Sequence, residues 1–301
     1  MTGSGEQLTD LPSGIRLCFE TFGSPDDPPV LLVMGLGGPM NWWDTSFCER
    51  LAEEGLFVIR FDNRDTGRST HLRQHRVGRL DIVKAAVGLV RTPPYRLDDM
   101  ADDVFGLLDH LGLEKAHLVG VSMGGMIVQT MAIAHPERTS SLTSIMSTTG
   151  RRTVGYQNPR VIPGLFLSNG EGREGYVSRQ LRGTPLISSP DYPAAEAAVR
   201  ARAEETYDRG WSPDGVVRQL LAILSQPDRT KALGRLRMPV TVVHGTKDPL
   251  VHRSGGKATA AAIPGAEHVE IPGMAHDLPE PLHGRIVEII SATVARAASR
   301  H

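Results

Sequence analysis

The chain has 301 residues, of which 40% are hydrophobic and 22% charged, a composition typical of a soluble globular protein. Its 33 Lys and Arg residues balance 34 Asp and Glu residues, so net charge gives no argument for nucleic acid or an anionic membrane surface as partner. The two cysteines, Cys18 and Cys48, exclude a disulfide framework and a cysteine-built zinc site. Because we find no secretory signal and no apolar run near the roughly 20 residues that span a bilayer, we expect a cytoplasmic protein without a membrane span.

Short apolar runs alternate with segments of helical periodicity along most of the chain, which predicts an α/β fold with a mainly parallel, doubly wound sheet. The first two runs flank the turn Pro12-Ser13-Gly14 and predict an antiparallel hairpin at a sheet edge. Later runs are continuously apolar, as in strands buried on both faces. The expected strands are 6–10, 15–22, 29–34, 57–61, 116–121, 141–146, 240–244 and 268–271. The expected helices are 43–54, 97–111, 123–134 and 282–298.

The alternation stops at about residue 150 and returns at about residue 234. The residues between contain several Gly and Pro breaks and only helical periodicity, for example at 194–207 and 216–224. We therefore predict a helical cap, residues 150–233, inserted into a core domain formed by residues 1–149 and 234–301. An independent C-terminal domain is the alternative, and the strand patterns on both sides of the segment disfavour it.

The strongest local pattern is the pentapeptide Gly120-Val121-Ser122-Met123-Gly124, which has the form G-x-S-x-G. An apolar run leads into it and a helical segment leaves it, which is the strand–turn–helix setting of a nucleophile elbow. Small residues are needed two positions before and after the serine, because the strand and helix backbones approach closely there. Ser122 is therefore the candidate nucleophile, in preference to a residue of a plain tight turn.

A serine hydroxyl needs a base to remove its proton, and the base needs a third group to orient it. In chains with this kind of elbow, the acid and the histidine follow the serine. Asp248 comes after the run 240–243, and His276 comes after the run that ends at Ile271. Both would emerge at the carboxyl ends of strands, the edge where open α/β sheets bind ligands. We predict a triad of Ser122, His276 and Asp248.

Rival residues are less suitable for these roles. Residues 138–170 contain no Asp or Glu, which excludes an acid directly after the strand that follows the elbow. His268 lies inside an expected strand and His283 inside an expected helix, so both are interpreted as packed or surface residues. Asp277 is adjacent to His276 in sequence, and because neighbouring side chains diverge, it is a poor group to orient the imidazole.

The reaction also needs hydrogen-bond donors for the developing oxyanion. We expect one to be the backbone N–H of Met123, directly after the nucleophile, and the other to be the N–H of Leu36. Leu36 lies in the glycine-rich turn 34–38 after the first buried strand. The same glycines do not form a dinucleotide motif, because Met40 stands where G-x-G-x-x-G needs glycine, and no Gly-Lys-Ser or Gly-Lys-Thr follows. With no metal-ligand spacing either, no cofactor is expected.

These motifs together resemble those of the α/β-hydrolase superfamily, and the resemblance covers essentially the whole chain. Residues 62–69 are similar to the family's D-x-R-G-x-G-x-S loop, with Asp65 where glycine is usual. This departure, with the Gly67-Arg68-Ser69-Thr70 run, is most similar to aclacinomycin methylesterases and related actinobacterial carboxylesterases or lipases. Met34 stands where many members have histidine before the oxyanion glycine. The resemblance implies an α/β-hydrolase fold with a helical cap.

Three other features leave alternatives open. Trp42 and Trp43 could line an acyl pocket or pack the following helix against the sheet. The arginine-rich segment 64–96 has an amphipathic centre at 80–90 that could contact an interface or an anionic substrate, but a basic run of this kind favours a solvated loop and helix face. The apolar residues of the stretch 161–167 could roof a pocket or anchor the cap to the core.

The sequence as a whole predicts a serine hydrolase that cleaves small-molecule, hydrophobic carboxylic esters through an acyl-enzyme. The same triad acting on a thioester, a peroxide or a C–C bond is an alternative, as is a non-catalytic ligand receptor on the same fold. Epoxide hydrolase and haloalkane dehalogenase chemistry is disfavoured, because those relatives have Asp at the elbow where this chain has Ser122. Neither nucleic acid nor a membrane is an expected partner, and the oligomeric state is left open.

Overall fold

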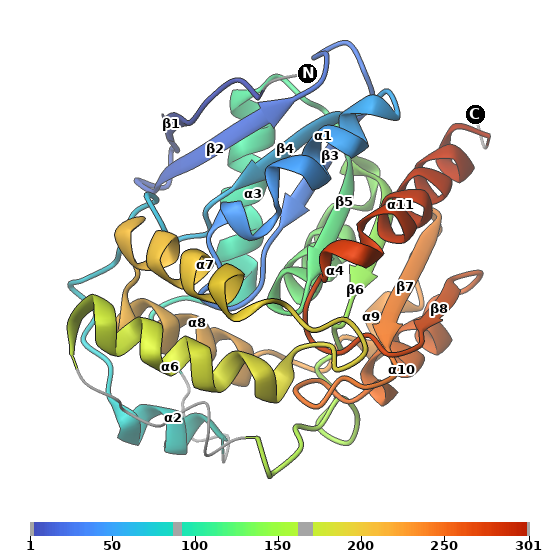
Figure 1. The fold of residues 1–301 in the computed structure, drawn as a ribbon. Helices are drawn as coiled ribbons and strands as arrows, with labels where there is room; N and C mark the ends of the chain where they lie inside the picture. Colours follow the sequence, from blue (N-terminus) through green and yellow to red (C-terminus); the bar gives the residue numbers. More distant parts are fainter. Residues whose placement is uncertain (1–2, 87–91, 162–170, 300–301) are drawn as a thin grey trace.

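The computed structural model describes residues 3–86, 92–161 and 171–299, which form an eight-stranded sheet with helices on both faces (Figure 1). The strand order is β1-β2-β4-β3-β5-β6-β7-β8. The β1–β2 and β2–β4 pairs are antiparallel and the remaining pairs are parallel, as predicted. The strands are β1 (Gln7–Asp10), β2 (Arg16–Phe22), β3 (Pro29–Val33), β4 (Phe57–Phe61), β5 (Ala116–Val121), β6 (Thr139–Ile145), β7 (Val240–Gly245) and β8 (Glu267–Ile271).

The helices divide into those that cover the sheet and those between β6 and β7 in sequence. The first group is α1 (Thr45–Glu53), α2 (Arg79–Ala86), α3 (Leu97–His110), α4 (Met123–Ala134), α10 (Ser254–Ala262) and α11 (His283–Ala298). The second group, called the inserted helices below, is α6 (Gly172–Ile187), α7 (Glu196–Asp208), α8 (Pro213–Leu224) and α9 (Thr230–Leu233). Short 3-10 turns are formed by Met40–Trp42, Pro136–Arg138 and Glu280–Leu282. None of the described helices is both long and apolar enough to cross a membrane.

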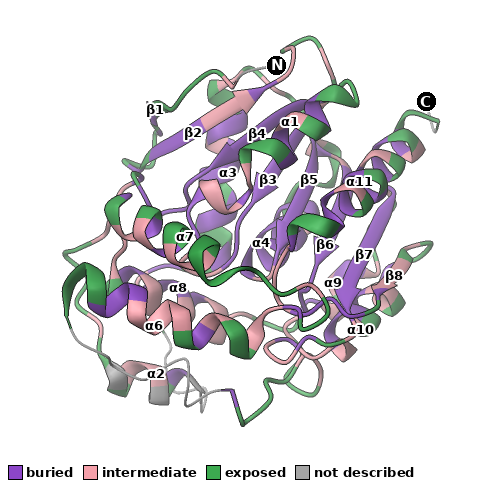
Figure 2. Cartoon of the chain, viewed as in Figure 1, coloured by how far each residue is buried: buried purple, intermediate pink, exposed green. Residues whose placement is uncertain are grey.

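The strands β3, β4, β5 and β7 are almost entirely buried, which explains their largely apolar sequences (Figure 2). Leu31 and Val33 of β3 pack in one apolar cluster with α3 and α4, whereas Val30 and Leu32 pack in another with α1 and α11. This alternation follows from the two-residue period of a strand. Figure 1 shows α1 and α11 in front of the sheet and α3 and α4 behind it. The predicted α/β fold with a doubly wound sheet is confirmed.

The inserted helices α6, α7 and α8 lie at the carboxyl ends of the strands (Figure 1). Their outer faces are largely exposed, and the small apolar cluster between α6 and α7 has Tyr176, Val177 and Ala203 as its buried members. The helical insertion is as predicted, while its bounds as a domain, 150–233, remain a prediction. Residues 162–167 of the apolar stretch 161–167 lie outside the described residues. The same is true of residues 87–90 of the amphipathic segment 80–90.

Several helices differ from the prediction. The helix expected at 43–54 begins at Thr45, after the 3-10 turn Met40–Trp42. The helices α6 and α10 were not predicted, because α6 contains Pro185 and three glycines and α10 begins with a pair of glycines. Such residues disfavour a helix locally by about 1 kcal/mol per glycine and more for proline. Packing against neighbouring elements overrides this preference.

Candidate active site

Ser122 occupies the sharp turn between β5 and α4. Its backbone has φ 55° and ψ −115°, a conformation that costs energy for a residue with a side chain. A Cβ atom built on Gly120 would lie 2.3 Å from the Gly124 carbonyl oxygen, and one on Gly124 would lie 2.0 Å from that of Val33. Because nothing larger than glycine fits at either position, the G-x-S-x-G spacing is a steric requirement of the turn.

The structure brings Ser122, His276 and Asp248 into one hydrogen-bonded chain. The Ser122 Oγ lies 2.9 Å from His276 Nε2, and His276 Nδ1 lies 2.8 Å from Asp248 Oδ2. Asp248 follows β7 and His276 follows β8, so both come from carboxyl ends of neighbouring strands. This arrangement lets the imidazole receive a proton from the serine hydroxyl while the carboxylate orients the ring.

The Asp248 carboxylate is fully enclosed and has every oxygen paired. Its Oδ1 accepts the backbone N–H groups of Leu250 and Val251, each at 2.9 Å. Burial by itself raises the pKa of Asp248, but the facing rings of His276 and His244 outweigh this effect and hold the pKa below its usual value. The group is therefore a carboxylate at neutral pH, the form that can accept a hydrogen bond from the protonated Nδ1 of His276.

His244, at the end of β7, is a second histidine on this carboxylate that the sequence interpretation missed. Its Nε2 lies 2.8 Å from the Val251 carbonyl oxygen and 3.3 Å from Asp248 Oδ2. Since both neighbours are acceptors, Nε2 carries the proton, an assignment made from the hydrogen-bond network. The sequence signal for this role is the position of His244 near the end of a strand, four residues before Asp248.

The C-terminal end of α6 and the residues directly after it contact the loop that carries His276. The Ile187 carbonyl oxygen accepts the His276 backbone N–H at 2.9 Å, and Ser189 Oγ accepts the Ala275 N–H at 2.8 Å. The Ser189 hydroxyl in turn donates to Asp277. Burial raises the pKa of Asp277, against the opposing effect of these Ser189 hydrogen bonds. Asp277 therefore binds Ser189 and does not orient His276, in agreement with the sequence argument.

The turn that contains Leu36 lies beside the nucleophile, since a Cβ built on Gly35 would be 3.2 Å from Ser122 Cβ. Met123 is the first residue of α4, where backbone N–H groups have no acceptor within the helix. Asn63 Nδ2 donates to the Met34 carbonyl oxygen at 3.0 Å and so ties one end of the turn to the loop after β4. The two N–H groups predicted as oxyanion donors therefore belong to segments that meet at Ser122.

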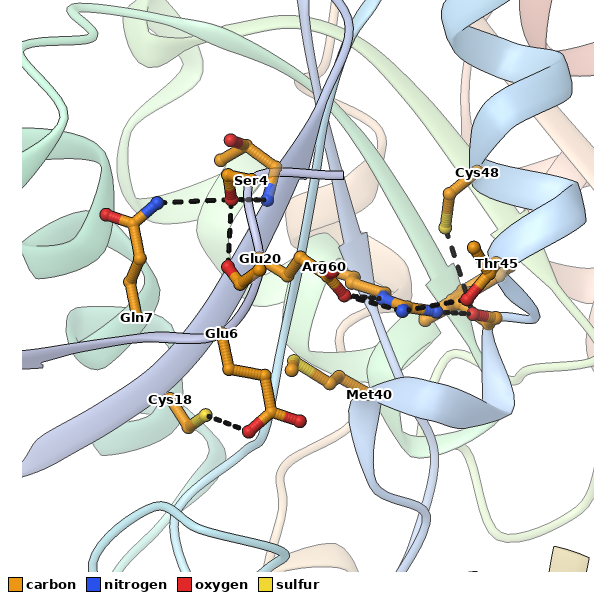
Figure 3. A network of polar contacts seen from close by, with 12 residues as sticks. Ser4, Glu6, Gln7, Cys18, Glu20, Met40, Thr45, Cys48 and Arg60 are labelled. Carbon is orange, nitrogen blue, oxygen red and sulfur yellow. Dashed lines mark hydrogen bonds and ion pairs between the residues drawn. The ribbon is translucent and has the colours of Figure 1, made fainter. Parts of the chain in front are cut away.

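The two tryptophans after this turn have different surroundings. Trp43 is fully buried and stacks on Phe47 of α1 at a ring distance of 5.4 Å, so it packs that helix against the sheet. Its carbonyl oxygen accepts a hydrogen bond from Arg60, whose guanidinium extends from β4 toward Thr45 at the start of α1 (Figure 3). Trp42 is half-buried, and its Nε1 donates to Thr206 Oγ1 of α7 at 2.9 Å.

The loop after β4 places two carboxylates against the inserted helices. Asp62 accepts the Met40 N–H at 2.7 Å and pairs with Arg209 at 2.8 Å. Asp65 has φ 67°, which explains why glycine suits this position, and its side chain pairs with Arg218 of α8. Both pairs are buried. Within the described residues, no group of three or more His, Cys, Asp or Glu side chains is arranged to hold a metal ion.

Comparison with known proteins extends these observations. Residues 28–280 match the family model described as "alpha/beta hydrolase fold". The chain belongs to this family. It is 28% identical to rhodomycin D methylesterase from Streptomyces peucetius, over 92% of this chain and 94% of the relative, and 26% identical to a 3-oxoadipate enol-lactonase from Acinetobacter baylyi, over 81% and 80%. The predicted superfamily is confirmed, and the predicted resemblance to methylesterases agrees with the first of these relatives.

Solved structures show the same fold as this hydrolase. A thermophilic esterase from Thermogutta terrifontis superposes with a TM-score of 0.71 at 24% identity, covering 98% of this chain and 99% of that one. The enol-lactonase from Burkholderia xenovorans LB400 superposes with a TM-score of 0.72 at 21% identity, covering 97% and 100%. At these identities the likeness establishes the architecture, and the chemistry is argued from the site.

Proposed function

We propose that this carboxylic ester hydrolase works as a serine esterase, with Ser122 as nucleophile, His276 as general base and Asp248 as the group that orients the imidazole. The unbroken chain of contacts from Ser122 Oγ through both ring nitrogens of His276 to Asp248 carries this proposal. The backbone N–H groups of Leu36 and Met123 are the proposed oxyanion donors, because their segments meet at the nucleophile.

The proposed reaction proceeds in two halves. Ser122 Oγ attacks the ester carbonyl while its proton moves to His276 Nε2, and the tetrahedral intermediate places its negative oxygen on the two N–H groups. The intermediate collapses to an acyl-enzyme as His276 returns the proton to the leaving alcohol. Water then attacks the acyl-enzyme by the same route, which releases the acid and regenerates Ser122.

For the substrate we propose a small, hydrophobic carboxylic ester, covered during the reaction by the cap segment 150–233. The methylesterase and lactonase names of the relatives agree with cleavage of an ester bond. The same triad would also serve a thioester, a peroxide or a C–C bond, and a ligand receptor would keep the fold without turnover. The strained backbone of Ser122 and its hydrogen bond to His276 favour catalysis over mere binding.

The test is labelling by a fluorophosphonate, followed by intact-mass spectrometry. Wild type and Ser46→Ala, a control on the exposed face of α1, should each gain one adduct, and Ser122→Ala should gain none. Turnover of an ester panel should fall by several orders of magnitude in Ser122→Ala and in His276→Ala. Normal ester turnover in Ser122→Ala would rule out the mechanism, and an unlabelled but folded wild type would favour the receptor.

A further inference from the structure

Gln219 of α8 is a fully buried side chain whose amide groups are all paired with backbone or side-chain atoms near the site. Its Oε1 accepts the Gly37 backbone N–H at 2.8 Å. Its Nε2 donates to the Arg64 carbonyl oxygen and to Thr66 Oγ1, each at 2.8 Å. One side chain therefore bridges the oxyanion turn 34–38 and the loop after β4, and its partners in both segments lie more than 150 residues from Gln219 in the sequence.

Helix α8 also contacts the same turn sterically. Gly37 has φ 67°, and a Cβ built there would lie 2.9 Å from a methyl group of Val216. The backbone at Gly37 thus lies directly against α8, and Gln219 holds its N–H toward that helix. Because the peptide that joins Leu36 to Gly37 is planar, fixing the Gly37 N–H also fixes the Leu36 carbonyl group in the same plane. The N–H of Leu36, the proposed oxyanion donor, belongs to the preceding peptide and is held relative to this fixed plane through the two backbone dihedrals of Leu36.

The turn itself supplies little polar support. Met34, which stands where many α/β-hydrolases have histidine, is apolar and buried, so its side chain cannot hold the turn by strong hydrogen bonds. Within the turn, the Gly38 N–H donates to the Gly35 carbonyl oxygen at 3.2 Å. The other polar contacts come from outside: Asn63 on the Met34 carbonyl oxygen at 3.0 Å, and Gln219 on the Gly37 N–H. Leu36 lies between these two anchored residues.

The helix that carries Gln219 is itself fixed to the core by a neighbouring contact. Arg218 pairs with Asp65 through two hydrogen bonds, of 2.6 and 2.8 Å, and both side chains are buried. Gln219 is therefore presented to the turn from a helix that has its own attachment. A side chain can hold another group in place only when the helix that carries it is itself held in place.

We propose that Gln219 is a positioning residue for the oxyanion hole, through which the inserted helix α8 sets the orientation of the Leu36 N–H. The proposal rests on the proposed function, because it assigns the Leu36 N–H to the oxyanion. Loss of a whole oxyanion donor lowers kcat by about 10²–10³-fold in a serine protease. A donor that is retained but no longer held should cost less, and we expect a decrease in kcat of about tenfold.

The test compares Gln219→Met, which keeps the size of the side chain and removes its hydrogen bonds, with Gln180→Met. Gln180 lies on α6 and donates to Tyr176 within the inserted helices, so it is a matched control. Active sites are first counted by fluorophosphonate titration, and ester kinetics are then expressed per active site. Gln219→Met should show kcat about tenfold lower with KM within about twofold, and the control should match wild type.

A second readout reports on the oxyanion directly. A trifluoromethyl ketone forms a hemiketal with the active serine, and the adduct carries a negative oxygen at the position of the oxyanion. The inhibition constant of the trifluoromethyl ketone should rise about tenfold in Gln219→Met and stay unchanged in Gln180→Met. A purely structural role would lower the fraction of titratable sites and leave both kcat per site and the inhibition constant unchanged, and this result would overturn the proposal.

Two further variants keep the test decisive if Gln219→Met does not fold. Gln219→Glu retains an acceptor for the Gly37 N–H but loses the amide donors to the Arg64 carbonyl oxygen and Thr66, so its kcat per site should fall about threefold at constant KM. Thr66→Val removes one anchor of the Gln219 amide and should lower kcat per site about threefold at constant KM. Unchanged kcat in folded Thr66→Val and Gln219→Glu would overturn the proposal. A wild type that neither hydrolyses esters nor takes the fluorophosphonate would instead refute the proposed function itself.

Discussion

The sheet and the inserted helices are held in place by different kinds of interaction. The sheet lies between two large apolar clusters, one with α3 and α4 and the other with α1 and α11. The inserted helices add a few apolar residues to the first cluster, Ala222 and Leu233 among them, and the insertion also contacts the core through buried polar groups: the Asp65–Arg218 pair, the Asp62–Arg209 pair and Gln219. Apolar packing accepts substitutions that conserve volume, whereas a buried charge depends on one particular partner. Specific pairings therefore set the position of the insertion over the site.

The same contrast appears around the site itself. Pairing by Arg218 and hydrogen bonds from Leu72 and Tyr95 hold the pKa of Asp65 below its usual value, even though burial by itself would raise it. The carboxylate is thus ionised and depends on its partners. By comparison, the elbow depends on glycines that need no partner and only require space.

The largest effect on stability should come from breaking the pair between Asp65 and Arg218. Arg218→Met leaves a buried carboxylate without its cation, and we expect the free energy of unfolding to fall by about 3–5 kcal/mol. Urea unfolding followed by circular dichroism at pH 7.5 measures this change. Asp65→Asn combined with Arg218→Met removes both charges, keeps an amide oxygen to accept the Leu72 N–H, places the amide NH2 where it can donate to the Tyr95 hydroxyl, and retains a residue that tolerates positive φ.

The double variant should regain more than half of the stability that Arg218→Met loses, because no unpaired charge remains buried. A double variant as unstable as the single one would show that packing, and not the unpaired charge, accounts for the loss. The inserted helices would then be attached by the same kind of interaction as the sheet.

A titratable group inside the sheet should make stability depend on pH. His117 of β5 contacts Ser141 Oγ at 2.8 Å, and burial lowers its pKa from 6.5 to about 4. Below pH 6.5 the unfolded chain binds a proton that the folded protein does not, so this contribution is complete above pH 6.5. It is lost progressively as pH falls toward 4, by about 3 kcal/mol at most.

Urea unfolding at several pH values, for wild type and His117→Gln, tests this dependence. Between pH 6.5 and 4, the slope of the unfolding free energy against pH reports how many protons are taken up on unfolding. This number should be smaller by close to one in His117→Gln than in wild type. An equal slope in both proteins would mean that His117 is protonated in the folded state at these pH values, and that burial does not control its titration.

The smallest effect should come from a change of volume in the apolar core. Ile59 of β4 is fully buried, and Ile59→Val removes one methylene while it keeps the β-branched shape. We expect a loss of about 1 kcal/mol in the free energy of unfolding, with esterase kinetics per active site unchanged. A loss as large as that of Arg218→Met would contradict the distinction between apolar packing and buried charge pairs.

Much of the site could be predicted because its requirements are local. The elbow needs glycine at 120 and 124 for steric reasons, and the acid and the histidine each follow an apolar strand by a few residues. Residues that support the triad were harder to find. His244 lies close to Asp248 in sequence, yet histidine at a strand end has many roles, and Ser189 and Gln219 belong to segments whose sequence has no motif.

The sequence by itself determined the fold family, the succession of strands along the chain and the position of Ser122, because apolar periodicity and backbone sterics act over a few residues. Only the tertiary structure decided that Ser189 would hold the loop of His276 and that Gln219 would bind the turn of Leu36. These contacts join segments that are 86 and 182 residues apart. A hydrogen bond acts over about 3 Å and depends on direction, so its partners are defined only once the chain has folded.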